Sequence, residues 1–115
     1  MKVIIAGSRT ITDYKLVKEF VDKQELDITE IVCGKASGVD SLGEKYALEK
    51  NIPVKYFPAD WNAYGKSAGY KRNLQMGEYG DLLILIWDGK SKGSKLMKDI
   101  MIKNQKEIKE LICEI

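Results

Sequence analysis

Three short segments of this chain combine glycine with hydroxyl, cationic and carboxylate side chains. They read GSRTITD at 7–13, GKASGVD at 34–40 and WDGKSKG at 87–93, and each follows an apolar run and precedes a helical pattern. Small residues let a ligand approach the backbone, and the N–H groups at a helix start attract anions. We therefore expect these segments to bind a phosphate or a carboxylate.

The side chains of these segments suit an anion to different degrees. Arg9 offers a guanidinium for bidentate contact, and Ser37 offers a hydroxyl group. Asp40 fits less simply, because its carboxylate competes with an anionic ligand at a helix start. It either caps the helix or accepts a hydrogen bond from a ribose hydroxyl, and the sequence leaves both interpretations open. Ser91 and Ser94, taken alone, indicate only a turn and a helix cap.

Composition limits the chemistry that the chain can perform. The 115 residues are 44% hydrophobic and 31% charged, and 19 Lys+Arg stand against 17 Asp+Glu. We expect one soluble domain over residues 1–115 with no need for a polyanionic partner. Histidine is absent, which excludes serine–histidine catalysis and a typical zinc site. We predict no metal, no cofactor, no membrane span and no signal peptide.

The two cysteines, Cys33 and Cys113, lie in apolar segments and lack the spacing of metal ligands. They predict reduced thiols and a cytoplasmic protein.

Apolar runs alternate with amphipathic segments along the chain. Strands are predicted at 2–6, 30–33, 53–57, 81–87 and, as an edge strand, 107–115. Helices are predicted at 13–23, 39–50 and 70–79, and a fourth opens at 88–93 and carries Leu96 to Met101. A long loop is predicted at 58–70, and a helical C-terminal segment is the alternative to the last strand.

This alternation predicts an α/β fold. We expect a Rossmann-like three-layer domain, with a parallel sheet of about five strands in the order 3-2-1-4-5 and helices on both faces. The three small-residue segments leave the first, second and fourth strands. They should therefore meet at the carboxyl edge of the sheet, where such folds bind ligands.

The predicted loop at 58–70 places aromatic rings among cations. Trp61, Tyr64 and Tyr70 alternate with Lys66 and Lys71, a pattern that can stack a base and hold its phosphate. The alternative is that Trp61 and Tyr64 pack the loop onto the domain. A loop of this length in a small domain favours a functional role.

Several segments together resemble a known family. They are IIAGSR with a following Asp13, CGKASGVDSLGEKYA, FPADWNAYGKSAGYKRNLQM and LLILIWDGKSKGS. They are similar to the YspA/YpsA-related branch of the SLOG superfamily, and the resemblance runs from the first strand to the fourth helix. It implies a Rossmann-like fold and a nucleotide or nucleotide-derived ligand. Other SLOG proteins include the LOG phosphoribohydrolases and the DNA-processing protein DprA.

The resemblance to LOG enzymes implies a site that binds without cleaving. Arg72 stands where those enzymes carry an arginine, but Met97 stands where they carry the catalytic glutamate. Cleavage of an N-glycosidic bond needs a carboxylate, which methionine lacks. Asp40 or Asp88 would have to replace it, so the catalytic candidates are Asp40, Asp88 and Arg72.

The resemblance to DprA is weaker where DNA would bind. Ser37 replaces an arginine of the DprA-type loop, and the net charge is only +2. Single-stranded nucleic acid usually follows a positively charged groove. Nucleic acid is therefore the less favoured partner, although five cations remain to line a channel: Arg9, Lys35, Lys66, Arg72 and Lys90.

The sequence predicts a sensor-type domain that binds a nucleotide or a nucleotide-derived small molecule, such as an ADP-ribose-like or cyclic signalling compound. The alternatives are a nucleotide N-glycosidase of the phosphoribohydrolase type and a single-stranded nucleic-acid-binding protein of the DprA type. The sequence leaves open whether the chain forms a homodimer. The predicted ligand-binding residues are Gly7, Ser8, Arg9, Gly34, Ser37, Gly38, Asp40, Trp61, Tyr64, Arg72, Asn73, Asp88, Gly89, Ser91, Gly93 and Ser94.

Overall fold

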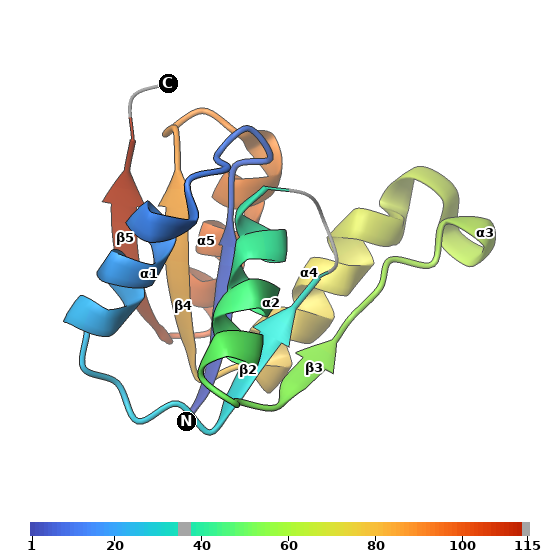
Figure 1. Cartoon of the computed structure of the whole chain (residues 1–115). Helices are drawn as coiled ribbons and strands as arrows, with labels where there is room; N and C mark the ends of the chain where they lie inside the picture. The colour runs from blue at the N-terminus through green and yellow to red at the C-terminus, as the bar shows by residue number, and fades with distance from the viewer. Residues whose placement is uncertain (35–37, 114–115) are drawn as a thin grey trace.

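One parallel sheet organises the chain, in a computed structural model that describes residues 1–34 and 38–113 (Figure 1). Its strand order is β3-β2-β1-β4-β5, as predicted, and every neighbouring pair is parallel. The strands are β1 (Lys2–Gly7), β2 (Glu30–Cys33), β3 (Val54–Tyr56), β4 (Leu82–Trp87) and β5 (Glu107–Ile112). The main helices are α1 (Tyr14–Lys23), α2 (Val39–Glu49), α4 (Ala68–Tyr79) and α5 (Lys92–Lys103).

The helices cover both faces of the sheet, which confirms the predicted three layers (Figure 1). α1 and α2 pack on the face that presents Val3, Ile5 and Ile84. α4 and α5 pack on the opposite face, which presents Ile4 and Leu83. All residues of β4 are buried. A central strand covered on both faces therefore appears in the sequence as an unbroken apolar run.

The C-terminal segment forms a strand over Glu107–Ile112, in parallel register with β4. The alternative of a helix is wrong for these residues, and residues 114 and 115 lie outside the described part of the chain. Among the described residues, no helix is long and apolar enough to cross a membrane.

The predicted loop at 58–70 is wrong in part, because most of it is helical. α3 (Trp61–Tyr64) is followed by a 3₁₀ turn (Gly65–Ser67), and α4 begins at Ala68 rather than at Tyr70. The carboxylate of Asp60 accepts a hydrogen bond from the backbone N–H of Ala63 at 3.0 Å and so caps α3. A helix this short carries no visible apolar period, so the capping aspartate appeared to belong to a loop.

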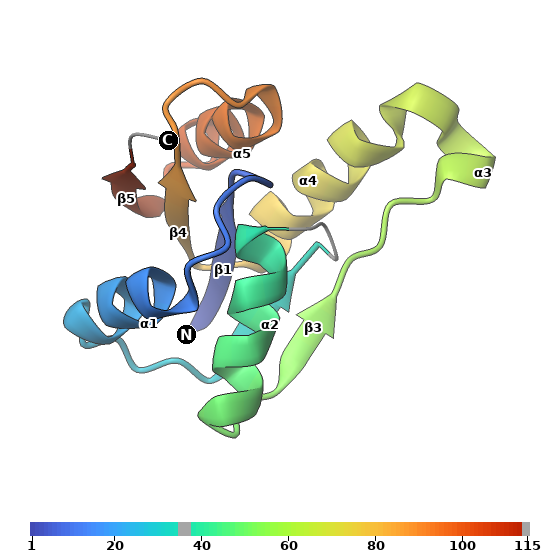
Figure 2. The same ribbon diagram turned by 45° about the horizontal axis from the view of Figure 1, so that its top comes forward.

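α4 and α5 are joined closely at their carboxyl ends. A Cβ atom on Gly77 would lie 2.4 Å from Cγ2 of Ile100, so the two helices approach through the absence of a side chain. The side chains of Asn104 and Lys106 donate hydrogen bonds to the Gly77 carbonyl at 3.2 and 2.7 Å. The amino ends of the two helices diverge (Figure 2). This V-shaped arrangement leaves the amino ends of α4 and α5 apart from each other on one face of the sheet.

We predict that Gly77→Ala lowers the free energy of unfolding by about 1–3 kcal/mol, because the added methyl overpacks the contact with Ile100. Gly93→Ala is the matched control, since nothing lies within 4 Å of a Cβ atom at Gly93. Urea denaturation of both variants measures the difference. A Gly77→Ala protein as stable as the wild type would show that α4 and α5 are not held at this distance.

Candidate functional site

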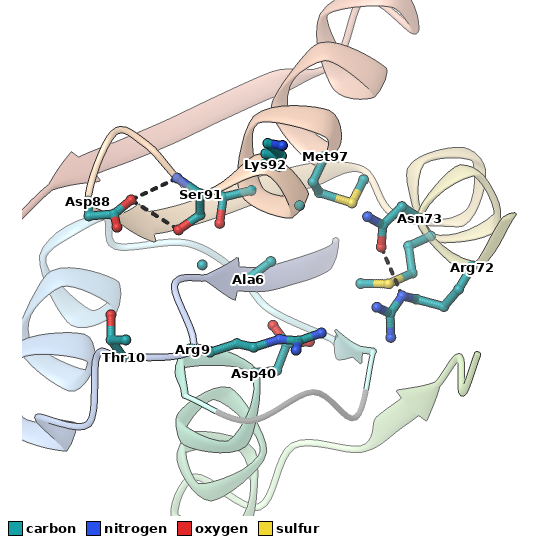
Figure 3. A pocket seen from close by; sticks show the side chains of 14 residues that line it. Ala6, Arg9, Thr10, Asp40, Arg72, Asn73, Asp88, Ser91, Lys92 and Met97 are labelled. Carbon is teal, nitrogen blue, oxygen red and sulfur yellow. Dashed lines mark hydrogen bonds between the residues drawn. The ribbon is translucent and has the colours of Figure 1, made fainter. Parts of the chain in front are cut away.

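A cavity of about 340 Å³ lies at the carboxyl ends of β1 and β4, between α4 and α5 (Figure 3). β1 and β4 are adjacent in the sheet at the point where the chain order reverses, which is the usual place for a ligand in an open α/β sheet. The described residues that line it are Ala6, Gly7, Arg9, Thr10, Asp40, Arg72, Asn73, Met76, Asp88, Ser91, Lys92, Gly93, Ser94 and Met97.

Ser8 joins the two loops that border this cavity. Its side chain is 1% exposed. Its Oγ accepts a hydrogen bond from the Asp88 N–H at 3.0 Å and lies 2.9 Å from Oγ of Ser91. The Ser91 hydroxyl donates to Asp88, so the Ser8 hydroxyl is left to donate to Ser91. The predicted ligand-binding role of Ser8 therefore corresponds, in the structure, to a hydroxyl that binds protein groups behind the cavity wall.

Asp88 organises the loop between β4 and α5. One carboxylate oxygen, Oδ1, accepts a hydrogen bond from the N–H group of Lys90 at 2.8 Å. It also accepts hydrogen bonds from the N–H group and the hydroxyl of Ser91 at 2.9 and 3.0 Å (Figure 3). These bonds favour the ionised form and hold the pKa of Asp88 below its usual value. At neutral pH this carboxylate carries no proton to donate, so its geometry suits loop positioning rather than acid catalysis.

The amino end of α5 borders the cavity directly. Ser91 is the N-cap residue, and its side chain makes no capping hydrogen bond to the helix. The first N–H groups of a helix have no partner within it and carry the positive end of the helix dipole. Gly93 leaves open space beside this end, and Lys92 adds a cationic side chain. The arrangement can accept an anion.

α4 supplies the opposite wall through Arg72 and Asn73. Nε of Arg72 donates to Oδ1 of Asn73 at 2.9 Å, and Nη1 donates to the carbonyl oxygen of Gly34. A Cβ atom on Gly34 would lie 2.8 Å from Nη1 of Arg72 and 3.1 Å from Oδ2 of Asp40. Glycine at this position therefore lets both side chains approach. Arg9 extends into the same space from the loop after β1 (Figure 3).

Gly38 packs two loops together. It has a φ of +71°, and a Cβ atom there would lie 2.4 Å from the carbonyl oxygen of Ser8 and 2.5 Å from Cα of Arg9. The positive φ and the lack of space for a Cβ atom both exclude a side chain at this position. The sequence suggested that this glycine admits a ligand, but its space is filled by the neighbouring loop.

The structure brings nine of the predicted ligand-binding residues to the cavity: Gly7, Arg9, Asp40, Arg72, Asn73, Asp88, Ser91, Gly93 and Ser94. Four others lie beside it or behind it, namely Ser8, Gly34, Gly38 and Gly89, while Trp61 and Tyr64 belong to α3. Ser37 and Lys35 lie outside the described residues.

Sequence reasoning missed Ala6, Thr10, Met76 and Lys92 as lining residues, and it treated Met97 only as a replacement for a glutamate. Helical spacing could have found Met76, which lies one turn after Arg72. Lys92 could have been found as the first residue of the helix that follows Ser91.

A family model described as the YspA, cpYpsA-related SLOG family matches residues 1–64, which is more than half of the chain. The chain belongs to this family. The match includes Arg9 and Asp40 and ends before Arg72 and the loop after β4. No curated protein matches the chain.

Among solved structures, the chain is similar to DNA processing protein A (DprA) from Streptococcus pneumoniae, with a TM-score of 0.81 and 17% sequence identity. The match covers 99% of this chain and 51% of that one, so the chain spans about half the length of the DprA structure. At this identity the likeness shows the fold, and it confirms the Rossmann-like architecture.

We predict that Asp88→Ala speeds hydrogen exchange at the N–H groups of Lys90 and Ser91, because both donate to the lost carboxylate. Amide exchange followed by NMR measures the rates. The amide of Cys113, which donates to the carbonyl of Trp87 at 2.8 Å, serves as the control for the neighbouring sheet edge. Unchanged rates at Lys90 and Ser91 would contradict the role of Asp88 as the organiser of this loop.

Proposed function

We propose that this SLOG domain binds the phosphate of a nucleotide or nucleotide-derived small molecule in the cavity between α4 and α5. The observation that carries the proposal is the convergence of two guanidinium groups, from Arg9 and Arg72, with the uncapped amino end of α5. Guanidinium groups and helix N-termini are the two protein features best suited to phosphate.

The cavity also has the size and the polar groups for more than an isolated phosphate. Its volume of about 340 Å³ falls within the range of small-molecule sites. Asp40 is 6% exposed and lines the cavity beside Arg72 and Asn73. A carboxylate and an amide can accept and donate hydrogen bonds to ribose hydroxyls, which favours a nucleotide over inorganic phosphate.

The same cavity favours binding without hydrolysis. Met97 is 2% exposed and lines the cavity, and its thioether neither donates a proton nor activates water. Among the described lining residues, only Asp40 and Asp88 carry a carboxylate, and Asp88 is engaged by its own loop. The enzyme alternative, a nucleotide N-glycosidase, therefore depends on Asp40.

Single-stranded nucleic acid is the second candidate ligand, and the likeness to the fold of DprA is the observation that favours it. A nucleic-acid backbone is tracked by a long cationic groove. Here the described lining cations are three, Arg9, Arg72 and Lys92, and they surround one cavity. This compact arrangement favours the small molecule.

We predict that Arg9→Ala weakens the binding of AMP and ADP-ribose by roughly 1.5–3 kcal/mol, the usual range for a hydrogen bond to a charged group. The melting temperature without ligand should stay the same, because Arg9 is exposed. Calorimetric titration measures the affinity. Lys15→Ala on the solvent face of α1 is the control, since it removes the same charge at a side chain that is 83% exposed. Equal affinities of Arg9→Ala and wild type would remove Arg9 from the site.

We predict weak binding of single-stranded DNA with a shallow salt dependence, because the cavity can neutralise only one or two phosphates. Each phosphate contributes a slope of about −0.7 in a plot of log affinity against log salt. Fluorescence anisotropy of a labelled random oligonucleotide at several salt concentrations measures both quantities. Submicromolar affinity at physiological salt with a steep slope would reverse the ranking of the two candidate ligands.

We predict that AMP and ADP-ribose remain intact during long incubation with the protein, because Met97 lies where hydrolysis would need a carboxylate. Chromatography for free adenine measures the reaction. Release of adenine beyond one equivalent in the wild type, lost in Asp40→Asn and kept in Asp88→Asn, would contradict the prediction and identify a hydrolase that uses Asp40.

A further inference from the structure

Trp61 lies at one end of α4, held over its first turn. Asp60 caps the short helix α3 that carries Trp61. A Cβ atom added to Gly69 would lie 3.5 Å from Cη2 of the indole, so the edge of the ring lies beside this glycine. The side chain nevertheless stays 57% exposed. The edge of the indole therefore lies beside Gly69, while much of the residue faces solvent.

The position of the ring edge beside Gly69 places the indole on a particular face of α4. Residues spaced by three, four and seven positions share one face of a helix. Gly69 has this spacing to Arg72, Asn73 and Met76, and these three residues line the cavity. The Trp61 ring therefore lies on the same face of α4 as the cavity wall, toward the amino end of the helix. At 1.5 Å per residue, Gly69 and Met76 are separated by about 10 Å along the axis.

Tyr70 is the comparison within the same segment. It follows Gly69 directly, so it points about 100° away around the helix axis. Its side chain is 50% exposed, nearly as much as that of Trp61. Exposure alone thus does not distinguish the two rings. Of the two rings, that of Trp61 lies on the side of α4 toward which a Cβ atom of Gly69 would point.

We propose that Trp61 is the stacking platform for the nucleobase of a ligand whose phosphate end lies between Arg9 and the amino end of α5. The proposal rests on the proposed function and specifies the class of ligand. Because Trp61 is not among the described residues that line the cavity, a base stacked on its ring lies outside the space that holds the phosphate, and the ligand must extend beyond the cavity. This requirement selects a dinucleotide or an ADP-ribose-like diphosphate over a mononucleotide.

The physical basis is the general affinity of indole rings for bases. Stacking of a base on an aromatic side chain contributes roughly 1–3 kcal/mol, and it needs an exposed ring held in place. Trp61 is 57% exposed, and the short helix that carries it is capped by Asp60, which holds the edge of the ring beside Gly69. ADP-ribose fits this layout with its terminal ribose phosphate in the cavity and its adenine on Trp61.

The test compares two probes, ADP-ribose and the base-free ribose 5-phosphate, by calorimetric titration. Trp61→Ala is expected to weaken ADP-ribose binding by about 5- to 150-fold and to leave ribose 5-phosphate binding unchanged. Trp61→Phe should restore most of the loss. Tyr70→Ala, which removes an equally exposed ring from the adjacent face of α4, should bind both probes as the wild type does.

The outcomes separate this inference from the proposed function. Unchanged ADP-ribose affinity in Trp61→Ala, together with weakened binding of both probes in Arg9→Ala, would overturn the platform and support the phosphate site. If Trp61→Ala loses the same affinity for ADP-ribose and for ribose 5-phosphate, the substitution acts on the fold, and Trp61 is not the stacking platform. An equal loss for AMP would overturn the choice of a longer ligand. Binding of neither probe by the wild type would overturn the proposed function and this inference with it.

Discussion

The hydroxyl of Ser8 holds the carboxyl ends of the two central strands in one arrangement. The backbone N–H of Ser8 donates to the carbonyl of Ile86 at 3.1 Å, and its side chain binds Asp88 and Ser91 in the loop after β4. Gly7 allows this closeness, because a Cβ atom there would lie 1.7 Å from the Ile86 carbonyl oxygen. The hydrogen bonds of Ser8 hold the loops after β1 and β4 together behind the cavity. The amino end of α5 then faces the cavity. A buried, fully bonded polar group of this kind specifies one loop geometry at the cost of tolerating few substitutions.

Asp88 and Asp40 lie at the same edge of the sheet, but their surroundings differ. Asp88 accepts backbone hydrogen bonds that lower its pKa and fix the loop before α5. Asp40 is buried beside the cavity, near Arg72 and Gly34. Arg72 in turn donates to the Gly34 carbonyl, so α4 is linked through one guanidinium to the loop after β2. A phosphate that engaged Arg72 would therefore act on both of these segments at once.

Much of the fold was predictable because parallel strands covered on both faces leave unbroken apolar runs. The run Leu82–Trp87 predicted a central strand, and the small residues after it predicted a loop at the ligand edge. What failed depended on neighbours that are remote in sequence. The close packing of Gly38 against Ser8 and Arg9, where a Cβ atom would clash, has no signal in the sequence. Met76 carries an apolar side chain that resembles a core residue in the sequence, and only its helical spacing from Arg72 indicates a place at the cavity.

The segment at 58–70 failed for a local reason. Asp60 and Gly65 are typical loop residues, yet one caps a helix of four residues and the other ends it. A helix this short is stabilised by its cap and its contact with α4, and neither is visible as a periodic pattern. The sequence pointed to Trp61 as a residue that can stack a base, but the face of α4 beside which its ring lies could be found only from the structure.

The central claim is that a nucleotide phosphate binds between Arg9 and the amino end of α5, and NMR titration of the labelled protein with ADP-ribose tests it most directly. The account predicts saturable shifts of the backbone N–H signals of Gly7, Gly93 and Ser94, with little change on the solvent face of α1. Saturable shifts confined to residues outside the cavity, or no shifts at millimolar ADP-ribose, would contradict it.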